Sequence, residues 1–281
     1  MKKLSIALAC ILSVSMLTAC GGESSEADST ADAASSGAEA AASSQQEESS
    51  EAEPEYKNIK LMLFGDSITD GFWLEGGYRT FLCNKLEESG LSQYVDFVGK
   101  KESGSGYDNQ HEGYTGYSIE RITESITGSR TGLKNVAKRR LEEDKPDVVT
   151  LMVGTNDILS HYELDTAGER LEGLVDLIYE YLPDDGMLFL ATIPCMDAND
   201  TTYIDAGTFT VEYMDECVDN YNAQVKALVD KKKGEGRNIE LVDVNAALTK
   251  EDLYDGVHPS EAGYIKLADL WYDIITNYIT Q

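Results

Sequence analysis

Hydrophobic and polar positions follow two different periods from residue 56 to the end of the chain. Five short runs rich in β-branched and other apolar residues predict buried strands, at residues 58–64, 94–99, 147–153, 186–193 and 238–244. Between them, apolar residues recur every three or four positions, which predicts helices at residues 78–89, 133–144 and 169–182. Because strands and helices alternate, the pattern predicts an α/β fold: a three-layer α/β/α, doubly wound sheet of about five parallel strands.

The first 55 residues follow a different pattern. Two lysines precede an uncharged apolar run at residues 4–17, as in a secretory signal peptide, and the run is shorter than the roughly 20 residues of a membrane-spanning helix. Residues 17–20, Leu-Thr-Ala-Cys, resemble the lipobox of bacterial lipoproteins, whose cysteine is acylated. We therefore expect a signal peptide at residues 1–19 and lipidation of Cys20, with an ordinary signal cleaved before Cys20 as the alternative.

A polar segment separates this signal from the periodic part of the chain. Residues 21–55 are mainly Ser, Ala and Glu, with no Lys or Arg, and such a composition cannot bury a core. As a flexible coil of about 35 residues, the segment would span roughly 30–35 Å. Residues 20–55 are therefore predicted to be a disordered, lipid-anchored tether. It would hold one domain, residues 56–281, at the extracellular face of a bacterial membrane.

Acidic residues outnumber basic ones along the chain. The sequence has 51 Asp and Glu against 23 Lys and Arg, a net charge of −28. Removing the ten acidic residues of the linker and the two lysines of the signal leaves 41 acidic and 21 basic residues in the domain. This balance disfavours nucleic acid as a partner, since phosphates need a cationic surface, and it disfavours direct docking on anionic lipid. A charge that only keeps an exported protein soluble remains the alternative.

The cysteines of the domain do not form a metal-site pattern. Cys83, Cys195 and Cys217 have none of the paired spacings that hold zinc or an iron–sulfur cluster, so we predict no metal and no cofactor. Cys83 lies in an apolar helical stretch and is expected in the core. A disulfide between Cys195 and Cys217 stays open at this point.

Chemically useful residues stand where the predicted strands end. In an open parallel sheet, ligands bind beyond the carboxyl ends of the strands. Ser67 follows the first strand, a glycine-rich loop at residues 99–117 follows the second, Asn156 follows the third, and His258 precedes the last helix. Ser67 alone could be explained as a helix cap. Together with Asn156, and with a histidine that has Asp255 three residues before it, Ser67 supplies the parts for nucleophilic acyl transfer.

These residue types have complementary roles in that chemistry. A serine hydroxyl is a poor nucleophile and needs a base, and His258 can take and return a proton near neutrality. Asp255 can hold the imidazole in the correct tautomer and stabilise its charged form. The negative charge that develops on the carbonyl oxygen needs donors already in place. The backbone amides of Ser67 and Gly116 and the side-chain amide of Asn156 are the candidates.

Four ordered blocks of the sequence resemble those of the SGNH, or GDSL-type, hydrolases. The blocks are GDSITDG at 65–71, GYTGYS at 113–118, GTND at 154–157 and DGVHP at 255–259. The resemblance covers nearly the whole domain and implies a flavodoxin-like fold and a serine esterase. It further implies that Ser67 is the nucleophile, that Asp255 and His258 complete the catalytic triad, and that Gly116 and Asn156 join Ser67 in the oxyanion hole.

The substrate prediction rests on the resemblance and on aromatic residues of the glycine-rich loop. The segments around the blocks look most similar to the carbohydrate esterases that remove acetyl groups from xylan and related polysaccharides. This implies an acetylated carbohydrate as the substrate. Tyr107, Tyr114 and Tyr117 are interpreted as candidates for stacking on a sugar ring, with packing under the loop as the alternative.

Other functions remain as alternatives. A lysophospholipase or thioesterase of the same family, or a peptidoglycan O-acetylesterase, would use the same catalytic residues on another ester. A solute-binding lipoprotein would also be α/β, but it would not need this combination of serine, asparagine and histidine. His111 and His161 lack a carboxylate at triad-like spacing and are interpreted as structural or rim residues. The oligomeric state is left open by the sequence.

Overall fold

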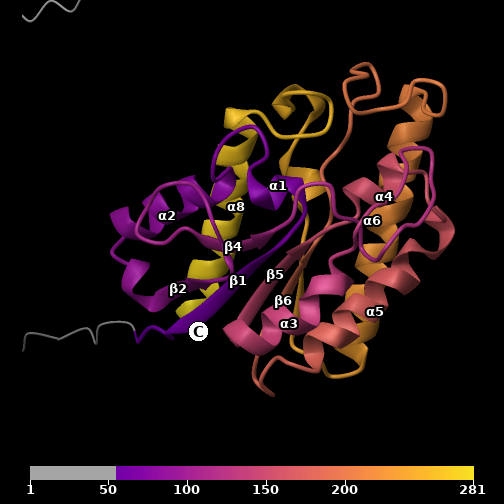
Figure 1. Cartoon of the computed structure of the whole chain (residues 1–281). Coiled ribbons are helices and arrows are strands. Elements are labelled where there is room, and N and C mark those ends of the chain that lie inside the picture. Colours follow the sequence, from indigo (N-terminus) through magenta and orange to yellow (C-terminus); the bar gives the residue numbers. More distant parts are fainter. Residues whose placement is uncertain (1–54) are drawn as a thin grey trace, which may run out of the picture. The chain divides into compact units, whose positions relative to one another are not determined.

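A seven-stranded, mostly parallel sheet forms the centre of the domain (Figure 1). The computed structural model describes residues 55–281, so the predicted signal peptide, Cys20 and all but the last residue of the predicted linker lie outside the described residues. The strands are β1 (Ile59–Gly65), β2 (Val95–Val98), β3 (Lys101–Glu102), β4 (Gln110–Gly113), β5 (Val148–Met152), β6 (Met187–Ala191) and β7 (Ile239–Val242).

All five strands predicted from the hydrophobic pattern are present and pair in parallel. β1 lies between β2 and β5, and β6 and β7 follow on the side of β5. Counted among themselves, the five strands have the order 2-1-3-4-5, which is a doubly wound arrangement with a switch point beside the first strand. The predicted fold class is therefore confirmed.

Two further strands are too short and too polar for the hydrophobic pattern to predict. β4 pairs with the end of β1, where Phe64 and Gly65 lie opposite Glu112 and Gly113, and β3 is antiparallel to β4. His111 and Glu112 are fully buried in β4, yet neither is apolar, so no hydrophobic run marks this strand. β4 matters for the site because the chain leaves it directly into the part of the glycine-rich loop that carries Gly116.

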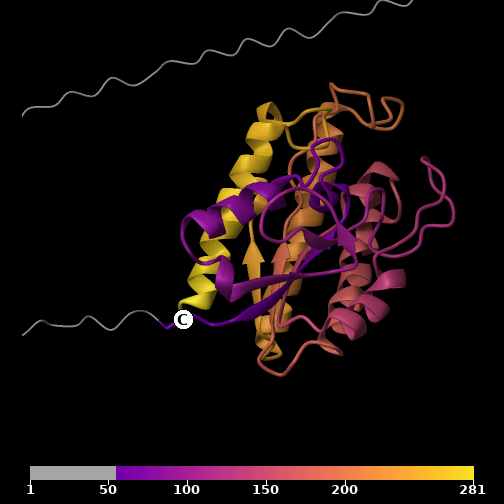
Figure 2. The same cartoon turned by 60° about the vertical axis from the view of Figure 1, so that its left-hand side comes forward.

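Helices cover both faces of the sheet (Figures 1 and 2). Two long helices lie on one face: α2 (Tyr78–Glu88) and α8 (Glu261–Ile279). Three lie on the other face: α3 (Lys134–Asp144), α5 (Ala167–Tyr179) and α6 (Val211–Gly234). α2, α3 and α5 correspond to the three helices predicted from the 3.6-residue period.

Two hydrophobic cores, one on each face, follow from the alternation of side chains along β1. Leu61 and Leu63 point toward α2 and α8 and share a core with the fully buried Trp271. Met62 and Phe64 point the other way, into the core beneath α3, α5 and α6. Because both faces of β1 are buried, the strand is a continuous apolar run rather than an alternating one.

Short helices complete the chain, and two of them follow strands closely. α1 begins two residues after β1, and α4 begins three residues after β5. The short elements are α1 (Ser67–Asp70), α4 (Thr155–Leu159), α7 (Val244–Ala247) and the 3₁₀ turns η1 (Ser92–Tyr94), η2 (Leu164–Thr166) and η3 (Lys250–Asp252).

The described chain begins and ends at the same place. The backbone amide of Lys57 donates a hydrogen bond to the carbonyl of Ile279 over 2.8 Å, and both views show the C-terminus beside the indigo start of the domain (Figures 1 and 2). β1 then carries the chain across the sheet to Ser67 at its far end. The chain therefore enters the domain at the end of the sheet opposite to Ser67.

Residues 55–281 contain no helix that is both long and apolar enough to cross a membrane. The cysteines of this part are free thiols: Cys83 is buried, as expected, and Cys195 and Cys217 do not pair with each other. Nor does this part of the chain hold a cluster of three or more His, Cys, Asp and Glu side chains suited to a metal ion.

Candidate active site

Ser67 is the first residue of α1, at the carboxyl end of β1. The cap of this helix is Asp66, whose side chain accepts a hydrogen bond from the backbone amide of Ile68 at 3.0 Å. The helix-cap explanation therefore applies to Asp66, and the hydroxyl of Ser67 is free for another partner. That partner is His258, whose Nε2 lies 2.9 Å from the Ser67 Oγ.

His258 and Asp255 belong to one tight turn before α8. The Oδ1 of Asp255 accepts hydrogen bonds from the backbone amides of Val257 and His258, at 3.1 and 2.7 Å, and its Oδ2 lies 2.8 Å from the imidazole Nδ1. Gly256 has a φ of +77°, a conformation that favours glycine. Since Nδ1–H donates to the carboxylate, Nε2 keeps a lone pair for the hydroxyl of Ser67.

A small pocket opens over these side chains. Its volume is about 150 Å³, and Ser67 and His258 form part of its wall. Larger hollows of about 460 and 530 Å³ lie elsewhere on the described surface, but neither is lined by these two residues. The remaining lining residues are Phe72, Thr115, Gly116, Arg130, Asn156, Leu159 and Tyr203.

Three residues that carry candidate oxyanion donors, Ser67, Gly116 and Asn156, line the same pocket. Asn156, in the first turn of α4, donates one side-chain N–H to the carbonyl of Tyr117 at 2.9 Å, which leaves its second N–H available. Gly116 has a φ of +80°. Among the hydrogen bonds of residues 55–281, none uses the backbone amides of Ser67 or Gly116. The three predicted oxyanion donors thus come from three separate elements, and all three residues line the pocket.

Arg130 links two of these elements, although nothing in its sequence context indicates that role. Its Nη1 donates to the carbonyl of Gly116 at 3.2 Å, and its Nε donates to the hydroxyl of Ser160 at 2.6 Å. Ser160 is the C-terminal cap of α4, the helix that carries Asn156. Arg130 therefore holds the glycine-rich loop against α4 and brings a positive charge to the pocket wall.

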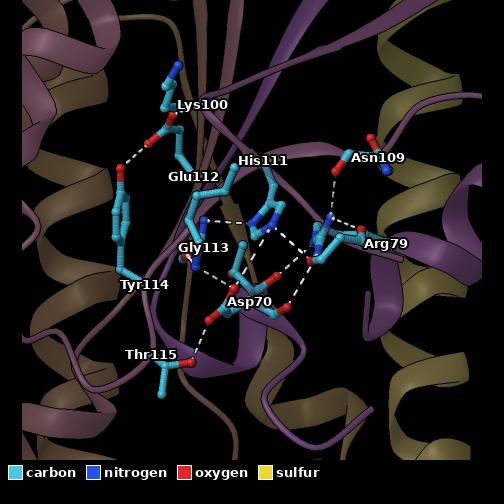
Figure 3. Close-up of polar contacts among 12 residues, drawn as sticks. Asp70, Arg79, Lys100, Asn109, His111, Glu112, Gly113, Tyr114 and Thr115 are labelled. Atoms are coloured by element: carbon cyan, nitrogen blue, oxygen red, sulfur yellow. Dashed lines mark hydrogen bonds and ion pairs between the residues drawn. The ribbon is translucent and has the colours of Figure 1, made fainter. Parts of the chain in front are cut away.

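A second polar link joins the loop to α1 (Figure 3). The hydroxyl of Thr115 donates to the carboxylate of Asp70, the last residue of α1, at 2.5 Å. Lys101 donates to the same carboxylate at 2.6 Å and to the carbonyl of Gly113 at 2.6 Å. Burial opposes ionisation of Asp70, but the hydrogen bonds from Lys101 and Thr115 outweigh it and lower the pKa of this carboxyl below its ordinary value.

His111 lies beside Gly113, where the chain leaves β4 for the loop (Figure 3). Its Nδ1 accepts a hydrogen bond from the amide of Gly113 at 3.1 Å, and its Nε2 lies 3.0 Å from the hydroxyl of Ser103. Burial, reinforced by the nearby charges of Arg79 and Lys101, lowers the pKa of His111 to about 3. A histidine held neutral in this way is structural, as the sequence predicts.

His161 lies outside the pocket. Its Nε2 is 2.7 Å from the hydroxyl of Tyr213 on the exposed surface, and its ring packs edge-on against Phe209. It shares no hydrogen bond with the three residues Ser67, Asp255 and His258. This position agrees with the interpretation of His161 as a structural or rim residue.

The three loop tyrosines do not line the pocket, and their role in stacking on a sugar ring stays a prediction. Tyr107 donates its hydroxyl to the carbonyl of Val95, at the start of β2, and packs on Phe97. Tyr114 donates to the carboxylate of Glu112, and its ring stacks on Tyr117 at 4.9 Å. These contacts favour packing under the loop, the alternative explanation, for Tyr107 and Tyr114, whose hydroxyls both have partners.

The aromatic side chains at the pocket come from other segments. Phe72 stacks on the imidazole of His258 with ring centroids 4.8 Å apart, and Tyr203 meets the same ring edge-on at 5.4 Å. Phe72 directly follows the block that contains Ser67, so its position was available from the sequence. Tyr203 lies in the long connection between β6 and α6, where no motif marks it.

The sequence of the chain is similar to those of known esterases. The model of the family of GDSL-like lipases and acylhydrolases matches residues 61–271. A multidomain esterase of Ruminococcus flavefaciens is 32% identical over 234 residues, which cover 79% of this chain but only 29% of that protein. An acetylxylan esterase of Geobacillus stearothermophilus is 27% identical over 233 residues, covering 74% of this chain and 90% of that protein.

A solved structure shares both sequence and fold with the chain. It is the family 3 carbohydrate esterase of Clostridium thermocellum, with a TM-score of 0.60 and 30% sequence identity over 79% of this chain and 100% of that one. A family 3 carbohydrate esterase from Talaromyces cellulolyticus, at 22% identity and a TM-score of 0.60, is similar in fold. The chain thus resembles single esterase domains along their whole length.

Proposed function

The chain belongs to the family of GDSL-like lipases and acylhydrolases, whose members hydrolyse ester bonds, and we propose that it removes acetyl groups from O-acetylated carbohydrate through an acyl-enzyme. One observation carries this proposal. Ser67, His258 and Asp255 form an unbroken hydrogen-bonded line, 2.9 and 2.8 Å between partners, at the wall of a pocket of about 150 Å³.

In the first half of the reaction, the Ser67 Oγ attacks the carbonyl carbon of the acetyl ester while its proton moves to the Nε2 of His258. Asp255 stabilises the resulting imidazolium through Nδ1–H. The carbonyl oxygen becomes an oxyanion and is met by the amides of Ser67 and Gly116 and by the free side-chain N–H of Asn156. Collapse of this intermediate breaks the ester bond, and His258 returns the proton to the departing sugar hydroxyl.

In the second half, water takes the place of the sugar. His258 removes a proton from the water as it attacks the acetyl carbon on Ser67, and the same three donors stabilise the second oxyanion. The bond from Ser67 to the acetyl carbon then breaks, and the proton held by His258 returns to the Ser67 oxygen. Acetate leaves and the enzyme is restored.

The volume of the pocket supports a small acyl group. About 150 Å³ is well below the roughly 300–1,000 Å³ of pockets that enclose a drug-sized ligand. Leu159 contributes an apolar side chain to the lining of this pocket, and Thr115 and Arg130 contribute polar ones. An acetyl group fits such a space, whereas a long acyl chain would extend onto the surface.

The relatives support a carbohydrate as the alcohol part of the ester. The proteins similar to this chain include one named acetylxylan esterase and a structure named as a family 3 carbohydrate esterase. A lysophospholipase, a thioesterase or a peptidoglycan O-acetylesterase would use the same catalytic residues. These alternatives differ from the proposal in the ester they hydrolyse and are separated by a substrate panel.

We also propose that the domain works at the outer face of a bacterial membrane, held by lipid on Cys20 and by residues 21–55. The position of Lys57 beside Ile279 supports this arrangement, because the chain enters at the end of the sheet opposite to Ser67. A tether at that end leaves the pocket facing away from its point of attachment. Metabolic labelling with palmitate in a bacterial host, with Cys20→Ala as the control, tests the anchor.

A substrate panel tests the esterase activity. We expect hydrolysis of p-nitrophenyl acetate and release of acetate from partially acetylated xylotetraose, with p-nitrophenyl octanoate hydrolysed more slowly than the acetate because the pocket is small. Faster hydrolysis of octanoate would favour a lipase. Binding of saccharides without hydrolysis of any ester would favour a solute-binding protein.

A further inference from the structure

Four aromatic side chains form two contacting pairs near the catalytic turn that holds His258. Phe72 meets Tyr203 edge-on at 5.9 Å, and the neighbouring Trp73 stacks on Tyr254 with ring centroids 4.2 Å apart and planes 13° from parallel. They come from three segments, after α1, between β6 and α6, and before α8, which lie at the same end of the sheet (Figures 1 and 2). We name Phe72, Trp73, Tyr203 and Tyr254 the aromatic platform.

The aromatic platform is exposed to an unusual degree. Only six large hydrophobic side chains of residues 55–281 are exposed, and three of them belong to the platform: Phe72 at 44%, Tyr203 at 42% and Tyr254 at 60%. Scattered exposed rings need no explanation, but apolar side chains gathered beside a reactive pocket indicate a binding surface. One of its two pairs, Phe72 and Tyr203, also lines that pocket.

Backbone contacts hold the aromatic platform to the catalytic turn. The indole Nε1 of Trp73 donates to the carbonyl of Pro259 at 2.7 Å, and the amide of Tyr254 donates to the carbonyl of His258 at 2.7 Å. Rings fixed in this way lose little freedom when a ligand binds, which favours affinity.

The loop with Tyr203 is attached to the same turn. The amide of Asp197 donates to the carbonyl of Gly256 at 2.8 Å, and a Cβ added to Gly256 would lie 2.8 Å from the carbonyl oxygen of Asp197. Ile204, next to Tyr203, is almost fully buried and anchors the loop to the core. The spacing between Tyr203 and the ring of His258 is therefore set by the fold.

We propose that the aromatic platform is a saccharide-binding surface with two positions: Phe72 and Tyr203 contact the acetylated sugar, and the Trp73–Tyr254 stack binds the next sugar unit of the chain. The inference rests on the proposed function and deepens it, because it predicts a preference for oligosaccharides over single acetylated sugars. The apolar C–H faces of sugar rings pack on aromatic faces, while the hydroxyls of Tyr203 and Tyr254 can bond sugar hydroxyls at the edge.

The chemistry of the aromatic platform favours a sugar over an acyl chain. Two of its exposed rings, Tyr203 and Tyr254, carry a hydroxyl, so the platform offers hydrogen-bonding groups as well as apolar ring faces, as a sugar ring does. It is also open, whereas an acyl chain is bound best in an enclosed apolar groove.

The test compares a long and a small substrate on matched variants. Tyr254→Ala removes the outer ring, Tyr254→Phe keeps the ring, and Tyr213→Ala removes an exposed tyrosine that lies outside the pocket. The measured quantity is the ratio of kcat/KM on partially acetylated xylotetraose to kcat/KM on p-nitrophenyl acetate. We expect Tyr254→Ala to lower this ratio about three- to tenfold, mainly through KM on the oligosaccharide, because a stacked ring contributes about that much.

The ratio of the two kcat/KM values should stay close to that of the wild type for Tyr254→Phe and should equal it for Tyr213→Ala. Binding gives a second readout: calorimetry with unacetylated xylotetraose on Ser67→Ala should show a weaker Kd when Tyr254→Ala is added. An unchanged ratio with an unchanged Kd would overturn the saccharide surface, as would an equal loss on both substrates. Failure of the wild-type protein to deacetylate any oligosaccharide would instead overturn the proposed function.

Discussion

The hydroxyl of Thr115 donates a hydrogen bond to the carboxylate of Asp70 over 2.5 Å and so ties the residue before Gly116 to the last residue of the helix that begins with Ser67. The contact connects two of the proposed oxyanion donors through side chains that do not touch the oxyanion. Lys101 reinforces it by bonding both Asp70 and the start of the loop. The distance between the two amides therefore depends on this link.

Replacing Thr115 by valine keeps the size of the side chain and removes its hydroxyl. We expect kcat on p-nitrophenyl acetate to fall about tenfold with little change in KM, since one oxyanion donor is worth 10²–10³ in rate and the variant displaces rather than removes it. Thr115→Ser keeps the donor and should stay close to the wild type. A higher KM with an unchanged kcat would make Thr115 a substrate contact instead.

Asn156 is expected to act after substrate has bound. Asn156→Ala should lower kcat by about 10²–10³ and leave KM nearly unchanged, because its free N–H bonds an oxyanion that is absent from the ground state. Asn277→Ala, an exposed asparagine of α8, is the matched control and should behave as the wild type. If Asn156→Ala raised KM and kept kcat, the residue would belong to substrate binding.

Asp66 makes stability depend on pH. Its carboxyl is fully buried, Oδ1 accepts from the amide of Ile68, and Oδ2 has no partner among the described residues. Burial raises the pKa of Asp66 to about 7. Between about pH 4 and 7, the unfolded chain releases this proton while the folded protein keeps it. This group therefore lowers the free energy of unfolding as pH rises, by up to about 1.4 kcal/mol per pH unit.

Asp66→Asn removes the titrating group and should remove this contribution. Urea denaturation of both proteins across this range should show that the free energy of unfolding of the variant, minus that of the wild type, rises with pH and levels off above about pH 7. A difference that stays constant across the range would show that Asp66 is ionised in the folded state.

Tyr107 is expected to matter for stability and not for specificity. Tyr107→Phe removes the hydrogen bond to the carbonyl of Val95, so the free energy of unfolding should fall by about 1 kcal/mol. The ratio of activities on acetylated xylotetraose and p-nitrophenyl acetate should not change. A lower ratio at an unchanged free energy of unfolding would show instead that Tyr107 contributes to substrate binding.

The hydrophobic pattern predicts the elements that bury apolar faces. Each of the five parallel strands is a run rich in apolar residues, such as Leu61 to Phe64, because its side chains enter both cores. Such a run in the sequence therefore predicts a strand that is buried on both faces. The hydrophobic pattern does not predict β4, because its buried residues His111 and Glu112 are polar and are stabilised by hydrogen bonds. A buried polar strand has no signature in a hydrophobicity pattern.

Some residues of the candidate site can likewise be predicted from the sequence, and others cannot. Ser67, Asn156 and His258 lie at strand ends or in a tight turn, and parallel topology alone brings such positions together. Arg130 and Tyr203 reach the pocket from long loops, and their positions depend on contacts made only after folding. Proximity to a motif along the chain is therefore a weak guide to which side chains line the pocket. It favours the loop tyrosines, whose rings do not line the pocket.

The central claim is that Ser67 is the nucleophile, and the turnover of Ser67→Ala on p-nitrophenyl acetate tests it most directly. The side chain lies at a strand end and contributes little to either core, so circular dichroism and thermal unfolding should match the wild type. Turnover should fall by a factor on the order of 10⁶, because the serine and histidine of a triad act as one unit. A folded Ser67→Ala protein that keeps more than a small fraction of the wild-type turnover would contradict the account.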